Sequence, residues 1–567
     1  MGITASLFIG RSALSAYQSA IQVVGNNLAN VATEGFTRLS PNLSGIPGTP
    51  TTGGQIGLGV RLASVRRNVN EALQARLRSA SSDKFSADSV RTGFTRIEGL
   101  LDPLGDQDIG SLMSEFFNSV GALQNSPDNT AARGAVVNTA SALGQKLREQ
   151  RMGLIGLRDD LNREIEVIVA EADGIATQIA DLNVQIASAE AGSAGQAGGL
   201  RDQRDQLLSR LSEFFDITVR EQPGGAVSVY VGNESLVQVG QSRGLQVATE
   251  IDANGLAISV PRFKQDNGPV SPLSGKTAGL ISARDTQIDG LLSRLNTLAS
   301  ALIQEVNKIH ASGQGLTGFT TLTSVSGITD PSLALTTAAN GVTLIPKTGS
   351  FFIDVKDNAT GAIDRHQINI DLDGIGTDST LNSVAADITA NTPLTATVGA
   401  DGRLTLSVPT GSTFTFADDT SDFLASIGLN VLFSGKDAAD IDVNPAVLAD
   451  PNLLAAAQSG LPGDGSNATA LELLENTAVT SLSGSSLNEF YTAIVGNVGV
   501  QSSGAQNTLD ASTIVFDSLS VQRESISGVN VDEEAVSLIR FQRAFEGAAR
   551  FMGVVDGMLQ TLLSLIR

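Results

Sequence analysis

An apolar repeat at the C-terminal end constrains the fold of this chain more than any other feature. From Asn530 onward, apolar residues follow one another at alternating spacings of three and four, which is the seam of a coiled coil. A seam of this kind is stable in water only when a second helix covers it. A partner helix is therefore required. The seam residues are Leu538, Phe541, Phe545, Ala548, Met552, Val555, Leu559, Leu562 and Ile566.

A matching repeat lies at the other end of the chain. Its apolar residues have the same spacing, so we predict that the first and last helices pair as a coiled coil. Between Ser12 and Thr33 the first helix carries no charge, whereas a helix on a solvated surface normally presents Lys and Glu. Two interpretations remain open: this helix is buried on several sides of one domain, or it packs against copies of itself in an assembly. The repeat consists of Leu7, Gly10, Leu14, Tyr17, Ile21, Val24, Leu28 and Val31.

The last helix also has a recognisable start. Asn530 has a side chain that favours the N-cap position, where its oxygen can accept from backbone amides. Asp532, Glu533 and Glu534 follow in the first turn, where carboxylates interact favourably with the positive end of the helix dipole. We therefore expect this helix to begin at Asn530.

Helical and β-type patterns alternate between the two ends. We predict one very long helix from about Asn129 to Glu190, whose seam contains a stutter near Leu161. Helical patterns also predict helices over 445–459, 469–482 and 487–526, whereas the Gly- and Pro-rich segment 39–59 predicts irregular or hairpin structure. Apolar and polar residues alternate on both sides of the turn at 223–225, and again in 351–357, 366–372 and 403–408, which predicts strands. The chain therefore leaves a helical region, passes through two β-rich regions and returns.

These patterns predict an α+β multidomain fold. The N- and C-terminal helices pair as a coiled coil, a long helical bundle follows, and two β-rich outer domains are inserted in the middle. The expected domains are a terminal coiled coil of 1–37 and 528–567, a helical bundle of 38–215, 275–312 and 445–527, a β-rich domain of 216–274, and a β-rich outer domain of 313–444.

Composition excludes several classes of function. The formal net charge is -22, so nucleic acid and anionic membranes are not expected partners. The chain has no cysteine, which excludes disulfides, thiolate metal sites and cysteine nucleophiles and fits either the cytosol or an export route that passes the chain unfolded and reduced. The first residues lack the features of a Sec signal, and no apolar stretch is long enough for a membrane span. We expect neither a cleaved signal peptide nor a transmembrane segment.

Reactive side chains are scarce. The two histidines, His310 and His366, do not have the spacing of metal ligands, so we expect structural roles for both. Charged residues alternate in 201–205, and we expect them to pair with neighbours on a solvated face and not to form a binding site. No enzymatic activity and no cofactor are therefore expected.

One acidic cluster imitates the start of a calcium loop. Asp371, Asp373 and Asp378 have spacings that could bring several oxygens to a hard cation. However, Ile375 stands where the third acidic ligand belongs, and Asn382 stands where the bidentate Glu belongs. We therefore favour a plain acidic β-turn over a calcium site.

The first helix and its exit carry a longer motif. The segment SALSAYQSAIQVVGNNLANVATEGFTR resembles the N-terminal signature of bacterial flagellar rod, hook and hook-associated proteins, although Phe36 stands where Tyr is common. In this family a helix with an Asn-Asn-x-x-Asn run leads into a Gly-aromatic-x-Arg turn. The matching residues here are Asn26, Asn27, Asn30, Gly35, Phe36 and Arg38.

The C-terminus narrows this resemblance. The segment SISGVNVDEEAVSLIRFQRAFEGAARFMGVVDGMLQTLL, with Gly528 and Asn530 near its start, is similar to the ending of the hook-associated members that form the first junction between hook and filament. The internal segments LRDQRDQLLSRL and DIDVNPAVLADPNLLAAA are similar to parts of the same members. The region 351–433 is the least diagnostic.

The resemblance implies a structural, non-enzymatic subunit of the extracellular flagellum, exported unfolded by the flagellar type III apparatus. It would assemble as a ring of copies, with the seam residues of the first and last helices as the assembly interface. The implied partners are the hook protein, a second hook–filament junction protein and an export chaperone that holds the C-terminal seam. We further expect residues before about Thr37 and after about Gly528 to be mobile in the monomer and ordered in the assembly.

Three alternatives remain open at this point. A hook or distal rod protein would share the N-terminal signature, although it would usually lack the long central helix. A secreted enzyme or an adhesin-like module could also be carried on flagellar ends, inserted in 216–444.

Overall fold

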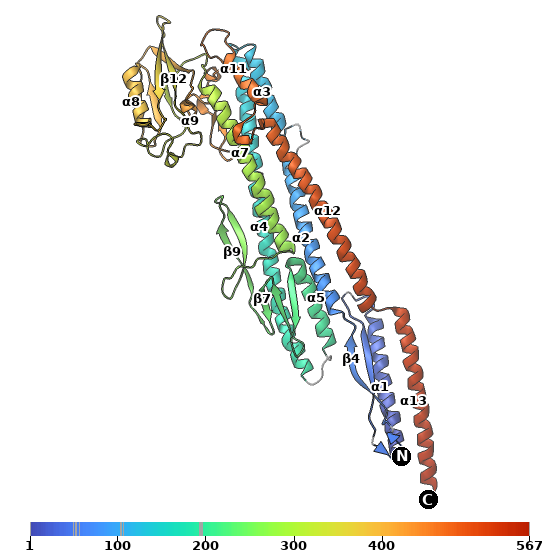
Figure 1. Ribbon diagram of the computed structural model, residues 1–567. Helices are drawn as coiled ribbons and strands as arrows, with labels where there is room; N and C mark the ends of the chain where they lie inside the picture. Colours follow the sequence, from blue (N-terminus) through green and yellow to red (C-terminus); the bar gives the residue numbers. More distant parts are fainter. Residues whose placement is uncertain are drawn as a thin grey trace. The chain divides into compact units, whose positions relative to one another are not determined.

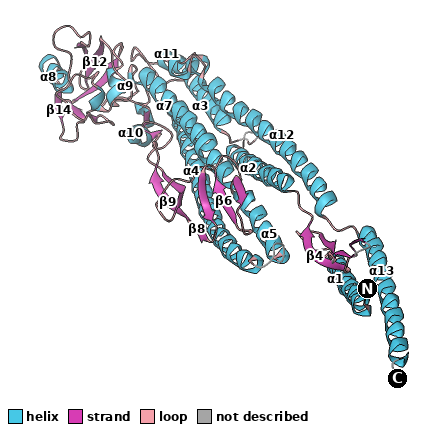
Figure 2. Ribbon diagram, turned by 60° about the horizontal axis from the view of Figure 1, so that its bottom comes forward, coloured by secondary structure: helices cyan, strands magenta, loops and turns pink. Residues whose placement is uncertain are grey.

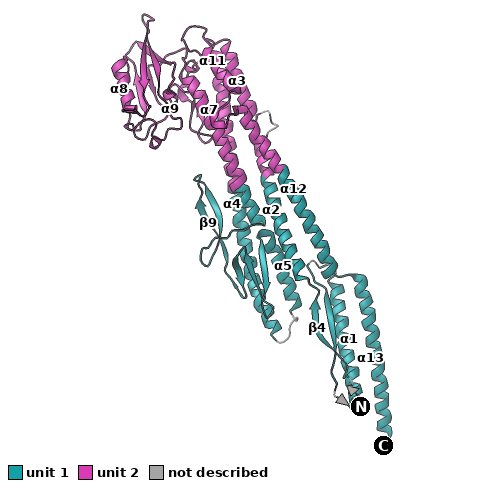
Figure 3. Cartoon of the chain, viewed as in Figure 1, with its two compact units in different colours: residues 1–93, 159–284, 503–567 teal, residues 94–158, 285–502 magenta. Residues whose placement is uncertain are grey.

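The computed structural model describes residues 2–33, 35–48, 50–51, 54–55, 57–102, 105, 107–191 and 197–565. The chain divides into two compact units (Figure 3). Unit 1 comprises 1–93, 159–284 and 503–567, and unit 2 comprises 94–158 and 285–502. Helices α2 (Glu71–Leu101), α4 (Thr130–Glu190) and α12 (Leu487–Ser527) contribute residues to both units. The four domain boundaries expected from the sequence stay predictions.

Unit 1 contains both ends of the chain and a β-rich part (Figure 1). Its other helices are α1 (Ile3–Ala29), α5 (Gly198–Phe214), α6 (Lys276–Ser282) and α13 (Val531–Leu565). A π-helical stretch, Ala283–Ile288, follows α6. Its strands are β1 (Leu39–Gly45), β2 (Pro50–Thr51), β3 (Gly54–Gln55), β4 (Val60–Arg67), β5 (Ile217–Glu221), β6 (Val227–Val231), β7 (Glu234–Gln238), β8 (Gln241–Ser242), β9 (Leu245–Ile251) and β10 (Ala257–Phe263).

The segment after α1 forms a hairpin. Strands β1 and β4 pair antiparallel, from Leu39 opposite Arg67 to Gly45 opposite Val60. The short strands β2 and β3 pair with each other between them. Of the irregular or hairpin structure expected for 39–59, the described residues form the hairpin.

The β-rich part of unit 1 is tied to α4 by two asparagines. The strands form one sheet in the order β5-β6-β7-β8 and a separate pair, β9 and β10, and Figure 2 shows both beside α4. Asn183 bonds both the carbonyl and the amide of Val227, at 2.8 and 3.0 Å. Asn162 bonds the carbonyl of Ala257 and the amide of Ser259, at 3.1 and 3.0 Å. Each amide side chain therefore satisfies backbone groups at a strand edge.

Unit 2 combines helices with small sheets. Its further helices are α3 (Ile109–Gln124), α7 (Asp289–Ala311), α8 (Leu381–Asn391), α9 (Phe423–Ile427), α10 (Pro445–Ala449) and α11 (Ser466–Leu473), and short 3-10 turns lie at Ala338–Asn340, Pro451–Leu453, Leu474–Asn476 and Thr480–Leu482. Its strands are β11 (Thr321–Thr323), β12 (Gly349–Asp357), β13 (Ile363–Ile370), β14 (Thr395–Val398), β15 (Leu404–Ser407), β16 (Ser412–Ala417), β17 (Phe433–Ser434) and β18 (Asp442–Val443).

The strands of unit 2 surround an aromatic core. They form two three-stranded sheets, β13-β12-β16 and β11-β15-β14, and the short pair β17-β18. Phe351, Phe414, Phe416 and Phe423 are fully buried, and the rings of Phe351 and Phe423 stack with centroids 5.6 Å apart. This β-rich region was expected from the sequence.

Helix α8 inside this region was not expected. Leu381, Val384, Ala385 and Ile388 are buried at helical spacing, and Thr380 begins the helix with a capping box. The Thr- and Asp-rich surroundings hid this short pattern when the region was interpreted as strands. The sequence therefore predicted the β-rich class of this region but not its helix.

The long helices agree with the sequence, whereas the short ones do not. The apolar seam of α4 is confirmed, because Leu154, Leu161 and Ile179 are at most 1% exposed. In contrast, the continuous helices expected over 445–459 and 469–482 are wrong, since only α10, α11 and single 3-10 turns form there. Asp450 ends α10 in an extended conformation, because the following Pro451 disfavours helical geometry in the residue before it.

Candidate assembly interface

Helices α1 and α13 pack along each other within unit 1 (Figure 1). The pair is antiparallel, because Gly10 near the start of α1 lies against Met552 while Asn27 near its end contacts Glu534. A small core of Ala20, Val24 and Phe541 lies between the helices. Tyr17, Ile21, Leu43 and Leu538 pack against this core. The pairing of the two ends is therefore observed as expected.

The predicted seam of α13 lies mostly on the side covered by α1. Phe541 and Val555 are buried, at 7% and 4% exposure. Leu538, Phe545, Met552 and Leu559 are half-buried, and Leu562 is 47% exposed. Ile566 lies outside the described residues.

The covered face of α1 consists of smaller residues than its apolar repeat suggests. Gly10, Ala16, Ala20 and Val24 are buried, and a Cβ built at Gly10 would lie 2.6 Å from the Sδ of Met552. Small side chains therefore let the two helices approach closely. The remaining predicted residues divide into the half-buried Leu7, Leu14, Tyr17 and Ile21 and the exposed Leu28 and Val31.

A second apolar stripe of α13 remains largely exposed, although its first member, Phe551, reaches Gly10 of α1. We call it the outer stripe, and its spacings of three and four residues place its members on one flank of the helix. Its exposed fractions run from 42% to 81%. Contiguous apolar surface of this kind marks sites of interaction in soluble proteins. The outer stripe consists of Phe551, Val554, Met558, Leu562 and Leu565.

Three polar side chains meet where α1, β1 and the start of α13 come together, and we call them the terminal polar cluster. Asn27 donates through Nδ2 to an oxygen of Glu534 at 3.0 Å, and Arg38 donates through Nε to the other oxygen at 2.7 Å. Asn27 and Glu534 are 0% and 2% exposed. Asn27 also bonds the amide and the carbonyl of Leu39, at 2.9 and 2.8 Å. The buried carboxylate is thus fully engaged, as burial of a charge requires.

Arg38 also contacts the turn between α12 and α13. Its backbone amide donates to the carbonyl of Ser527, the last residue of α12, at 2.9 Å. A Cβ at Gly528 would overlap the carbonyl oxygen of Glu524, so this position requires glycine. Asn530 then accepts from the amide of Asp532 at 2.9 Å, which confirms its expected N-cap role.

The other signature residues shape the exit of α1. Asn30 donates to the side chain and the carbonyl of Asn26, at 2.7 and 2.9 Å. Gly35 has a φ of 76°, a conformation that glycine adopts without strain. Phe36 is half-buried. These residues turn the chain from α1 into β1, where Arg38 can reach α13.

Three segments of the chain, at the two ends and in the middle, match models of flagellar protein families. The model of the flagellar hook-associated protein FlgK helical domain matches residues 94–323. The model of the flagella basal body rod protein matches residues 7–37, and that of the flagellar basal body rod FlgEFG protein C-terminal region matches residues 522–565.

Relatives that match over the full length of the chain distinguish between these families. The chain is 28% identical to flagellar hook-associated protein 1 of Salmonella typhimurium over 568 residues, covering 98% of each. It is 25% identical to the proteins of that name from Escherichia coli, over 98% of each, and Bacillus subtilis, over 99% of this chain and 98% of that protein. The chain is thus similar over nearly its whole length to members of the flagellar hook-associated protein 1 family. Members of this family are structural proteins of the flagellum and not enzymes.

A solved structure agrees with the fold. The flagellar hook junction protein FlgK from Burkholderia pseudomallei is similar with a TM-score of 0.53 and 17% identity, over 80% of this chain and all of that one. This likeness supports the α+β multidomain fold expected for a hook-associated protein.

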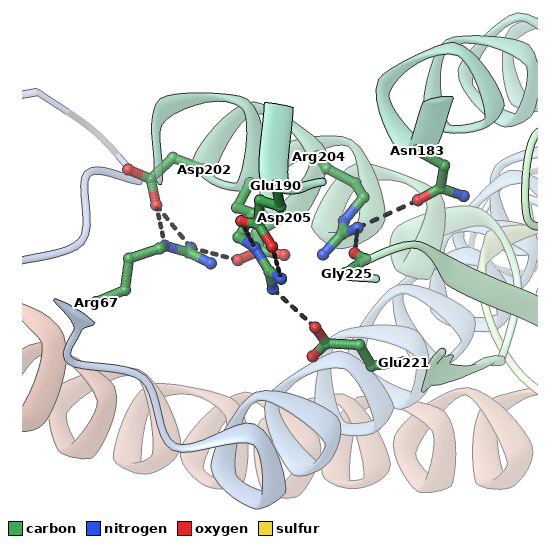
Figure 4. A network of polar contacts seen from close by, with 9 residues as sticks. Arg67, Asn183, Glu190, Asp202, Arg204, Asp205, Glu221 and Gly225 are labelled. Atoms are coloured by element: carbon green, nitrogen blue, oxygen red, sulfur yellow. Dashed lines mark hydrogen bonds and ion pairs between the residues drawn. The ribbon is translucent and has the colours of Figure 1, made fainter. Parts of the chain in front are cut away.

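A second polar network joins α5 to the hairpin after α1 (Figure 4). Arg67 at the end of β4 donates to Asp202 and Asp205 of α5, at 2.6 and 2.5 Å. Burial alone would lower the pKa of Arg67, but the carboxylates of Asp205 and Asp202 raise it above its ordinary value. Burial raises the pKa of Asp202, and Arg67 opposes this shift.

The rest of this network faces α4 and the β-rich part of unit 1 (Figure 4). Arg201 pairs with Glu190 and Glu221, each at 2.9 Å. Arg204 donates to Asn183 at 3.1 Å and to the carbonyl of Gly225 at 2.7 Å. The expected pairing of these charges is therefore confirmed.

The expected solvated face is wrong. Asp202 and Arg204 are only 9% and 3% exposed, and burial lowers the pKa of Arg204. Their partners come from segments that are distant in sequence, so local charge alternation could not reveal that α5 is covered.

The two histidines occupy structural positions, as expected. His310 is 0% exposed; its Nδ1 lies 2.7 Å from the carbonyl oxygen of Asn430, and its Nε2 accepts from the amide of Ala455 at 3.0 Å. This arrangement holds a neutral ring, and burial lowers its pKa to about 4. His366 lies on β13, 3.2 Å from Asp364.

The acidic loop has the geometry of a turn. Asp373 accepts from the amide of Ile375 at 2.8 Å, Asp378 from that of Gly374 at 3.0 Å, and Asp371 from that of Asp373 at 3.4 Å. The carboxylates therefore cap their own loop. Within the described part of the chain, no group of three acidic or histidine side chains is arranged to hold a metal ion.

The helices offer no membrane-spanning segment. None of those described combines enough length with enough apolar character to cross a bilayer.

Proposed function

We propose that this chain assembles through α1 and α13 as a ring of copies at the junction between hook and filament. The relatives named above are hook-associated proteins, and the Burkholderia pseudomallei protein is called a hook junction protein. The observation that carries the proposal is the outer stripe, which leaves five apolar side chains of α13 in water. Association with a further helix would remove this surface from water and stabilise the pair.

The exposed face of α1 supports the same proposal. Ser15, Gln18, Gln22 and Asn26 are exposed on it, and α1 carries no charge after Arg11. Uncharged polar side chains can be buried against a neighbouring subunit at a much lower desolvation cost than Lys or Glu. In the proposed assembly the interface comprises the seam residues of both helices together with these outer surfaces.

The proposed partners follow from position. In the ring, one end would meet the hook protein and the other a second hook–filament junction protein. Before assembly, the apolar surface of α13 would need protection, so we include an export chaperone that binds the C-terminal seam. Delivery by the flagellar type III apparatus completes the proposal. The absence of cysteine fits such a route.

The test adds one charge to the outer stripe. Met558 is 57% exposed, so Met558→Asp should leave the α1–α13 pair intact while placing a carboxylate in the proposed interface. Burial of an unpaired charge costs several kcal/mol, and about 1.4 kcal/mol corresponds to tenfold in binding. In cells that lack the native gene, the variant should reduce the number of filaments by at least about tenfold and accumulate unassembled in the medium.

The matched control adds the same charge elsewhere on α13. Gln560 is exposed and lies outside the outer stripe, so Gln560→Asp should support normal filaments. Normal filament numbers with Met558→Asp, at equal export, would show that the outer stripe is not the assembly surface.

A further inference from the structure

The terminal polar cluster joins three segments at one point. Arg38 donates through Nε to Glu534 and through Nη1 to Glu533, both at 2.7 Å, while its amide bonds the end of α12 at Ser527. One residue therefore holds both sides of the turn that separates α12 from α13. Asn27 adds the end of α1, because it bonds Glu534 and both backbone groups of Leu39.

The apolar contact between α1 and α13 leaves their register weakly specified. Its central cluster consists of the three buried residues Ala20, Val24 and Phe541, and a heptad-like seam places equivalent apolar residues at each repeat. A shift of one turn moves a helix by about 5.4 Å and still leaves apolar residues facing each other. Buried polar contacts, in contrast, are satisfied in a single register.

We propose that Asn27, Arg38 and Glu534 set the register of α13 on α1 and fix the direction in which α13 leaves α12. This inference rests on the proposed function, because the outer stripe must stand at a defined height beside α1 to match a neighbouring copy. A one-turn shift would leave the carboxylate of Glu534 without Arg38 and Asn27. The terminal polar cluster thus favours the one register in which the outer stripe stands at the height that assembly requires.

The opposite end of the helix pair provides a readout of register. A Cβ at Gly10 would lie 2.7 Å from the Cγ of Met552, so Gly10→Cys with Met552→Cys should form a disulfide within one chain in the native register. Gly10→Cys with Asp556→Cys reports a shift of about one turn. The natural chain has no cysteine, so each pair contains the only two thiols present.

Both cysteine pairs are placed in the full chain with unaltered Arg38, with Arg38→Ala, and with Arg66→Ala as the matched control. Arg66 lies exposed on β4 beside the terminal pair, outside the terminal polar cluster. The rate of disulfide formation is measured in dilute monomers by mass, with separation of monomers from any cross-linked dimers. The measured quantity is the ratio of native to shifted cross-linking.

Arg38→Ala should lower this ratio by about tenfold, the effect of about 1.4 kcal/mol, whereas Arg66→Ala should leave it unchanged. Arg38→Lys should give an intermediate ratio, because one ammonium group cannot reproduce the Nε and Nη1 contacts to two carboxylates. Equal ratios for Arg38→Ala and Arg66→Ala would overturn the inference. The cross-linking ratio is measured on monomers and needs no partner copy. It therefore remains informative even if Met558→Asp assembles normally and the proposed function fails.

Discussion

Several buried polar side chains of this protein act as connectors between distant backbone segments. Asn27 bonds β1 and Glu534, Asn183 bonds the carbonyl and amide of Val227, and His310 bonds Asn430 and Ala455. A buried polar group is costly when it lacks a partner and specific when it has one. Each connector therefore selects one arrangement of the segments that it joins.

His310 makes stability depend on pH. Burial lowers its pKa from 6.5 to about 4, so between these values the unfolded chain binds a proton that the folded chain does not. Stability is complete above about pH 6.5 and falls as the pH drops toward 4. Urea unfolding of the full chain should show that unit 2 loses about 2 kcal/mol between about pH 7.5 and about pH 5.

The control for this prediction removes the titrating group. His310→Gln should lower stability at neutral pH, because Gln cannot keep both hydrogen bonds in place, but it should flatten the dependence between about pH 7.5 and pH 5. An unchanged slope in His310→Gln would assign the pH dependence to other groups.

The sequence identified some of these residues and missed others for clear reasons. Asn27 and Arg38 were found through the resemblance to flagellar proteins, which could not say what they contact. Glu534 was noted only as one of three acids in a first helical turn, since nothing local separates it from Asp532 and Glu533. Its burial depends on Arg38, far away in the sequence.

At the scale of elements, the terminal helices are held by a thin contact. Phe541 is the one aromatic side chain in the small core with Ala20 and Val24, and Val555 is the other buried apolar residue of α13. A helix pair with so little buried apolar surface is marginal by itself. Its stability should respond strongly to single truncations.

Phe541→Ala should detach α13 from α1. Removal of a buried phenylalanine ring costs about 3 kcal/mol or more, which is comparable to the whole stability of such a pair. Limited proteolysis of the full chain should then cut within 531–565 much faster, while the rest of the chain remains protected.

Ile539→Ala is the matched control for this truncation, because Ile539 lies on the same helix and is 56% exposed. It should leave the rate of cleavage nearly unchanged. Equal cleavage rates for Phe541→Ala and Ile539→Ala would mean that the small core does not hold α13.

Long elements were predictable from sequence because their periodic signal accumulates over many turns. The bounds of α4 and α12 agree with the apolar pattern to within a few residues. Short elements such as α8 and α11 depend on caps and tertiary packing that a local pattern shows weakly. Similarly, the apolar repeat of α1 indicated that it packs on α13, but it did not show that Ala16 and Ala20 lie in the buried face or that Leu28 is exposed.

At the scale of the whole molecule, both ends of the chain lie in one compact unit. Unit 1 contains 1–93 and 503–567, and the terminal helices present an outer stripe that remains largely exposed in the described chain. The sequence predicted this meeting of the ends and the flagellar class, while the outer stripe required the structure. Such a subunit would carry its proposed interface on a helix pair with little buried apolar surface of its own.

Hydrogen exchange of α13, measured on the dilute monomer and on the assembled protein, tests the central claim most directly. If the terminal pair becomes fully stable only when neighbouring copies cover it, amides in 538–562 should exchange quickly in the monomer and become at least about a hundredfold more protected in the assembly. Equally strong protection of these amides in both forms would contradict the claim that assembly stabilises the terminal helices.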